Sequence, residues 1–164
     1  MQEITGMKPK LTTNTIHLIN QVQLELTAPF SDRCTLLFAV KPALGMGHFS
    51  IQLIEEESPF LIVREWRPDR QTSYPAGIFD LNDVYIGERR LVLLHADYAF
   101  IQGIKDLDRG MKKSEGIVLD GADYSLIVGD ETIRWILTDQ LSPELDAALS
   151  KLCALAGFEP GYWK

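Results

Sequence analysis

The clearest hydrophobic pattern in the chain lies near its C-terminus, where apolar residues recur at helical spacing. These residues are Leu145, Ala148, Leu149, Leu152, Leu155 and Ala156, and they predict one buried helix face. Ser142 can cap the helix with its hydroxyl, and Pro143 suits the first helical position, where an N–H has no partner. We therefore expect an amphipathic helix from Pro143 to Ala156, ended by Gly157 and packed on a sheet.

Upstream of this helix, apolar and polar residues alternate with the period that is typical of half-buried strands. Residues 124–128 and 132–138 flank Gly129 and Asp130, which favour a tight hairpin turn. One face of the second strand carries Ile133, Trp135 and Leu137. We expect these three side chains to share a core with the leucines of the helix.

The N-terminal half carries similar strand signals. Residues 15–26 predict a strand with one solvent-exposed (wet) face and one buried face, because the apolar residues occupy even positions. These residues are Ile16, Leu18, Val22, Leu24 and Leu26. Residues 34–40 are apolar at nearly every position and predict a central strand. Residues 49–53 and 60–66 alternate on either side of an acidic turn and predict a hairpin.

Shorter signals fill the remaining segments. Residues 84–86 and 91–95 flank a charged turn and predict another hairpin, and residues 97–104 could add a strand. The chain would then contain about nine or ten short strands and one C-terminal helix. This mainly β, α+β pattern is typical of an antiparallel β-sandwich or a small β-barrel.

The organisation of the chain indicates a single domain. No internal repeat and no linker rich in Gly, Ser or Pro divides residues 15–164, and we expect residues 1–14 to be a flexible N-terminal segment. Residues 67–83 form the longest irregular stretch. A loop of this length in a compact domain is often functional.

The protein is acidic, since its 164 residues carry a formal net charge of −7 at pH 7. This balance argues against nucleic acid and against an anionic membrane surface as partners, because both are bound through clustered Lys and Arg. The sequence contains no membrane-spanning apolar run and no signal-peptide core. Cys34 and Cys153 are too few for a disulfide framework. We therefore expect a cytoplasmic protein; its oligomeric state does not follow from the sequence.

Three histidines are candidates for catalysis. His17 lies on the wet face of the first expected strand and is expected to be a plain surface residue. His48 follows a glycine-containing loop that could present it to a substrate. His95 precedes Asp97 by two residues, so the two would share a face only on an unbroken strand. Loop carboxylates such as Asp80 could assist either histidine.

Signatures of metal and nucleotide chemistry are missing from the sequence. It contains no Cys-x-x-Cys or His-x-x-x-His pair, no phosphate-binding glycine loop and no Gly-x-Ser-x-Gly. We therefore expect neither a metal nor a cofactor.

The most suggestive group of residues for binding combines arginines with aromatic side chains. It consists of Arg64, Trp66, Arg67, Arg70 and Tyr74. In an acidic protein such a group forms a local positive patch, which could hold a carboxylate, a phosphate or an acidic loop. The alternative is that the arginines pair with neighbours such as Glu65 and Asp69 on a solvated rim.

Two classes of function remain open from the sequence. A non-catalytic binding module, such as an immunity-type or adaptor protein or a carrier of a small ligand, fits the acidic charge and the shortage of catalytic motifs. The alternative is a small β-barrel enzyme that uses His48 or His95 with loop carboxylates. We expect the binding module, without enzymatic activity, and a protein or a small ligand as its partner.

Overall fold

The structure is a computed structural model, and it describes residues 20–42, 47–66, 86–116, 122–159, 161 and 163. Its centre is a six-stranded antiparallel sheet with the strand order β4-β3-β2-β1-β6-β7. The strands are β1 (Cys34–Lys41), β2 (His48–Ile54), β3 (Phe60–Trp66), β4 (Gly87–Val92), β6 (Asp123–Val128) and β7 (Glu131–Ile136). Two short strands, β5 (Met111–Lys112) and β8 (Gln140–Leu141), pair in a second small sheet.

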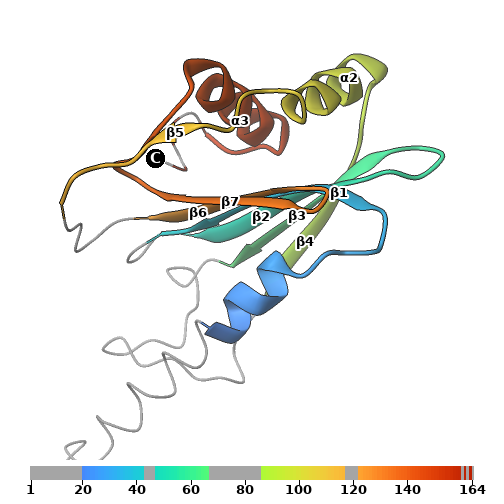
Figure 1. Ribbon diagram of the computed structural model, residues 1–164. Helices are drawn as coiled ribbons and strands as arrows, with labels where there is room; N and C mark the ends of the chain where they lie inside the picture. Colours follow the sequence, from blue (N-terminus) through green and yellow to red (C-terminus); the bar gives the residue numbers. More distant parts are fainter. Residues whose placement is uncertain are drawn as a thin grey trace, which may run out of the picture.

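Helices lie on both sides of the large sheet (Figure 1). The helices α2 (His95–Ile104) and α3 (Pro143–Leu155) lie over one side, which we call the first face. A helix described over residues 20–27 lies on the opposite side, the second face. None of the helices in the described part of the chain is both long and apolar enough to cross a membrane.

The expectation of a β-sandwich or a small β-barrel is wrong, because the main sheet is open. β1 lies in its middle, between β2 and β6, whereas β4 and β7 form two separate edges. The fold is therefore α+β, with helices instead of a second large sheet covering the apolar strand residues. The expected central strand and the hairpins β2–β3 and β6–β7 are confirmed.

The expected strand over residues 15–26 is wrong where the structure describes it, since residues 20–27 are helical. Val22 and Leu26 are buried, with 2% and 0% exposure, whereas Leu24 is 71% exposed. Residues four positions apart share one helix face. In an alternating apolar pattern, residues four positions apart would share a face in a helix as well as in a strand. The exposure of Leu24, which a strand would bury with Val22 and Leu26, shows that this segment is a helix.

Residues 97–104 form most of α2 and do not form a strand. Ile101 and Ile104 are the buried residues of this helix, and both join the main core. Their spacing of three places them on one helical face. Apolar neighbours that are not fully buried, such as Ala99 and Phe100, obscure this short signal in the sequence.

The charged residues 87–90, expected as a turn, belong to β4, which pairs with β3 over Phe60 to Glu65. β4 is an edge strand, and three of its consecutive residues, Glu88, Arg89 and Arg90, are exposed. Edge strands accept charged side chains readily, and the charges protect the edge from pairing with other chains.

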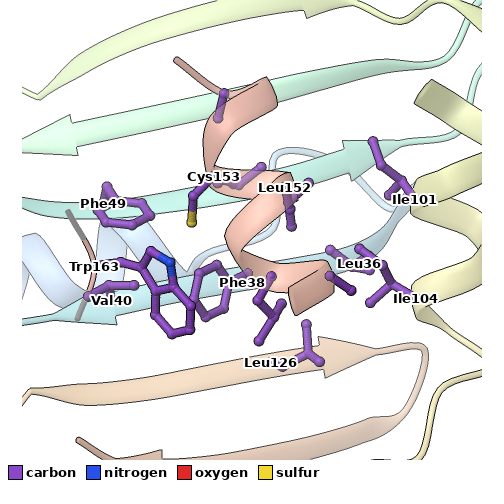
Figure 2. Packing of buried hydrophobic residues seen from close by; sticks show 14 of the residues in the cluster. Leu36, Phe38, Val40, Phe49, Ile101, Ile104, Leu126, Leu152, Cys153 and Trp163 are labelled. Carbon is purple, nitrogen blue, oxygen red and sulfur yellow. The ribbon is translucent and has the colours of Figure 1, made fainter. Parts of the chain in front are cut away.

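The main core fills the space between the first face and α3. Leu36, Phe38 and Val40 alternate along β1 toward this core. Figure 2 shows Phe38 beside Trp163 beneath the helix, and their ring centroids are 5.6 Å apart in an edge-to-face arrangement. The Tyr124 hydroxyl donates a 2.7 Å hydrogen bond to the Trp163 carbonyl oxygen. This contact ties the end of the chain to the sheet.

The C-terminal helix follows the sequence prediction closely. The Ser142 hydroxyl accepts a hydrogen bond from the Leu145 N–H at 3.2 Å. Gly157 has a φ of 87°, and the Phe158 N–H donates to the Cys153 carbonyl, which completes a Schellman stop. Of the three residues expected to share the helix core, Ile133 and Trp135 do so. Leu137 follows the end of β7 and is 45% exposed.

Candidate functional site

The second face of the sheet is only partly covered by the helix over residues 20–27. The strand register places nine side chains of β1, β6 and β7 on this face in three rows, since partners in register share a face. The first row is Lys41, Asp123 and Ile136, the second is Ala39, Ser125 and Arg134, and the third is Leu37, Ile127 and Thr132. All of these except Leu37 line a hollow of about 690 Å³. We call this hollow the β1–β6–β7 groove.

The groove is hollow because its middle row begins with two small residues. Ala39 and Ser125 form its centre, where larger side chains would fill the space. Gln23 and Thr27 of the helix form one wall, and Lys113 contributes to the lining near β7. The size of the groove falls within the range of known small-ligand sites.

Three cationic side chains meet at the groove in this acidic protein. Lys113 is partly neutralised, because its Nζ donates to Asp139 Oδ2 at 3.0 Å and to the Arg134 carbonyl at 3.1 Å. Lys41 and Arg134 make no side-chain hydrogen bond or ion pair with any part of the chain that the structure describes. The single carboxylate of the lining is Asp123, which lies directly opposite Lys41 in the register. The described lining therefore carries a surplus of positive charge.

The acid that holds Lys113 is itself fixed by the backbone. Asp139 accepts hydrogen bonds from the N–H groups of Ser114 and Ile136 at 2.8 and 3.0 Å. Burial opposes ionisation of this carboxyl, but these hydrogen bonds and Lys113 outweigh it and lower its pKa to about 2. The wall of the groove at β7 is thus anchored by an ionised carboxylate.

Arg64, the first of the expected binding residues, contacts the helix on the second face. Its guanidinium donates to the carbonyl oxygens of Glu25 and Ala28 at 3.1 and 3.2 Å. It also pairs with Glu88 at 2.9 Å. A cation at the C-terminal end of a helix interacts favourably with the helix dipole and with its free carbonyls. Arg64 lines a hollow of about 330 Å³ that is separate from the larger groove.

Trp66, the second expected binding residue, is 1% exposed and packs with Val22 and Leu26. It therefore joins the helix to β3. Arg67, Arg70 and Tyr74 lie outside the described residues. Their role in binding stays a prediction.

His48 lies under the same helix and is 7% exposed. Its Nδ1 is hydrogen-bonded to the Gln23 side chain, and its ring centroid lies 4.9 Å from that of Trp66. Burial, with a smaller contribution from the charge of Lys41, lowers the pKa of His48 to about 4. His48 is thus a neutral structural residue at neutral pH, and no carboxylate among the described residues forms an ion pair with it.

His95 and Asp97 are not brought together as a catalytic pair. Both lie in the first turn of α2, where residues two positions apart point in different directions. The expectation depended on an unbroken strand, which the helix replaces. His17 and Asp80 lie outside the described residues.

The described residues contain no group of three or more His, Cys, Asp or Glu side chains that could hold a metal ion. Cys34 and Cys153 are both free thiols. Burial raises the pKa of Cys153 to about 12, so this thiol is protonated and unreactive at neutral pH.

Sequence reasoning missed the groove, because its residues come from three strands, a helix and Lys113, and none of them is distinctive alone. One signal was available in the strand 123–128, where Asp123, Ser125 and Ile127 form the side of β6 that faces away from the core. No protein-family model, no curated protein and no solved structure matches this chain.

Proposed function

We propose that this protein is a non-catalytic binding module and that it holds its partner in the β1–β6–β7 groove. The observation that carries this proposal is the meeting, around the hollow of about 690 Å³, of polar side chains without a partner among the described residues. Lys41, Arg134 and Ser125 line the groove, and none of them has a side-chain partner in the described parts of the chain. Polar groups that the fold does not need are available to a ligand.

The position of the histidines supports binding over catalysis. An enzyme of the expected kind needs His48 or His95 beside a carboxylate, within hydrogen-bond reach. His48 is buried against Gln23 and Trp66, and His95 lies on α2, over the other face of the sheet from the groove. In the described structure His48 thus contributes packing, and His95 is exposed, away from the groove.

The experiment is affinity capture from a lysate of the source cell, with proteins and small molecules identified by mass spectrometry. A groove variant carries Lys41→Glu and Arg134→Glu. The matched control carries Arg33→Glu and Lys151→Glu, two exposed cations that do not line the groove. Both variants replace two cations by two carboxylates, so a general charge effect appears in both. We expect the groove variant alone to lose the partner.

A second double variant compares the groove with Arg67 and Arg70. Arg67→Glu with Arg70→Glu tests the residues that the sequence favoured. If this variant loses the partner and the groove variant keeps it, the partner binds through Arg67 and Arg70 and the groove assignment is wrong. Turnover of a co-purifying small molecule by the purified protein would contradict the non-catalytic function.

A further inference from the structure

We propose that the β1–β6–β7 groove binds an extended segment of a partner protein that carries acidic side chains. This inference rests on the proposed function, since it assumes that the groove is the binding site. It adds the chemical class of the partner, which the position of the cations and hydroxyls indicates.

The cations are spaced for more than one carboxylate. Lys41 on β1 and Ile136 on β7 lie in the same row, separated by two strand spacings. Arg134 lies two residues from Ile136 along β7. With strands about 4.8 Å apart and a rise of about 3.3 Å per residue, the Cα atoms of Lys41 and Arg134 are about 12 Å apart. Two carboxylates from residues two to four positions apart in an extended peptide span about 7–13 Å. One segment could therefore reach both cations.

The surface between the cations carries small side chains with hydroxyl groups that can form hydrogen bonds. Ser125 occupies the centre of the groove, and Thr132 lies beside Ile127 in the next row. Neither hydroxyl has a side-chain partner in the described structure. A hydroxyl can donate to a carboxylate or to a peptide carbonyl, so the floor of the groove suits an extended backbone with acidic side chains.

Charge complementarity favours an acidic partner over a basic one. In the described lining Lys41 and Arg134 stand against the single carboxylate of Asp123, while Asp139 partly neutralises Lys113. The protein as a whole has a net charge of −7, so it repels large polyanions while the groove attracts a local acidic segment. This contrast favours a short acidic stretch over a nucleic acid.

The test measures binding of a fluorescein-labelled nonapeptide with Glu at alternate positions by fluorescence anisotropy. The matched probe has Gln in place of every Glu. We expect the Glu peptide to bind at least tenfold more tightly than the Gln peptide at low salt. Its affinity should fall steeply as the salt concentration rises, since ion pairs at an exposed surface are screened.

Variants of the full chain separate charge from shape. Lys41→Gln with Arg134→Gln removes the cations, and Ser125→Trp fills the hollow without changing the charge. We expect each to weaken the Glu peptide at least tenfold. The control Arg33→Gln with Lys151→Gln should change its affinity less than twofold. Circular dichroism and the melting temperature confirm that each variant is folded.

The outcomes distinguish failure of this inference from failure of the proposed function. Equal binding of the Glu and Gln peptides, or no binding of either, overturns the proposal that the groove binds an acidic segment. Displacement of the peptide by inorganic phosphate or citrate at lower concentration than by unlabelled peptide assigns the groove to a small anion and also overturns it. If Ser125→Trp blocks lysate capture while the charge variant does not, the groove binds its partner but the acidic chemistry is wrong. If neither variant affects capture, the proposed function itself fails.

Discussion

The two faces of the sheet are built from the same strands but differ in the contacts that hold a helix on each of them. On the first face, α3 covers a continuous apolar core that includes Phe38 and Trp135. On the second face, the helix over residues 20–27 is joined to the sheet by a small cluster around Trp66 and by polar contacts from Arg64, Gln52 and His48. Toward β6 and β7 the second face is hollow and polar, whereas an apolar cluster of Ile54, Phe60 and Ile62 fills its other side. The first face thus holds the larger core, and we propose that the groove on the second face is the binding site.

The largest loss of stability is expected from a substitution in the core of the first face. Leu149 is 0% exposed and lies in the main core. Leu149→Ala should lower the free energy of unfolding by about 2–5 kcal/mol through lost burial and the cavity that remains. Leu149→Asp should abolish the cooperative fold, because it places a charge in the core. Urea denaturation measures both; a cooperatively melting Leu149→Asp protein would contradict the placement of α3.

A smaller loss is expected from the helix on the second face. Leu26 is 0% exposed, and Leu26→Ala should cost about 2–3 kcal/mol. Leu24, 71% exposed on the same helix, is the matched control, and Leu24→Ala should change stability by less than about 0.5 kcal/mol. Denaturant midpoints of the two variants provide the measurement. Equal effects would mean that this segment alternates as a strand and is not a helix.

The burial of His48 predicts a dependence of stability on pH. Its pKa is lowered from 6.5 to about 4 in the folded protein, so the unfolded chain binds more protons between these values. The stabilising contribution is complete above pH 6.5 and is lost as the pH falls toward 4. Between pH 8 and pH 5 the loss amounts to about 2 kcal/mol from this residue.

The variant His48→Gln is the control for this pH dependence, because glutamine keeps a polar side chain but does not titrate. Urea denaturation at pH 8 and pH 5 compares it with the unchanged protein. The unchanged protein should lose about 2 kcal/mol more than the variant over this range. The same slope in both proteins would show that His48 is accessible to solvent. The low pKa of Asp139 acts separately, since its contribution is lost only below about pH 4.

The smallest effect on stability is expected from the groove. Arg134 is exposed and has no side-chain partner in the described structure. Arg134→Gln should therefore change the free energy of unfolding by less than about 0.5 kcal/mol while it weakens binding. Thermal unfolding and the peptide titration are measured on the same preparation. A loss of stability equal to that of Leu26→Ala would show that Arg134 supports the fold and does not serve a ligand.

Much of the first face could be predicted from the sequence, and much of the second could not. The helix from Pro143 and the hairpin around Gly129 have local signals, namely a cap, a stop glycine and a clear period. In the described part of the helix over residues 20–27, Val22 and Leu26 are the buried residues, and their spacing also fits a strand. Short segments of this kind take the structure that tertiary contacts favour. Here Arg64 and Gln52 supply such contacts, because both donate hydrogen bonds to the carbonyl oxygen of Ala28.

The sequence by itself determined the elements whose signals are local: the C-terminal helix with both of its ends, the central strand β1 and the two hairpins beside it. Only the tertiary structure decided that the sheet stays open, that Arg64 and Trp66 hold a helix, and that Lys41 and Arg134 border one groove. The physical reason is register. A strand's pattern shows which side chains share its faces, but the neighbours across the sheet are set by pairings between residues far apart in the chain.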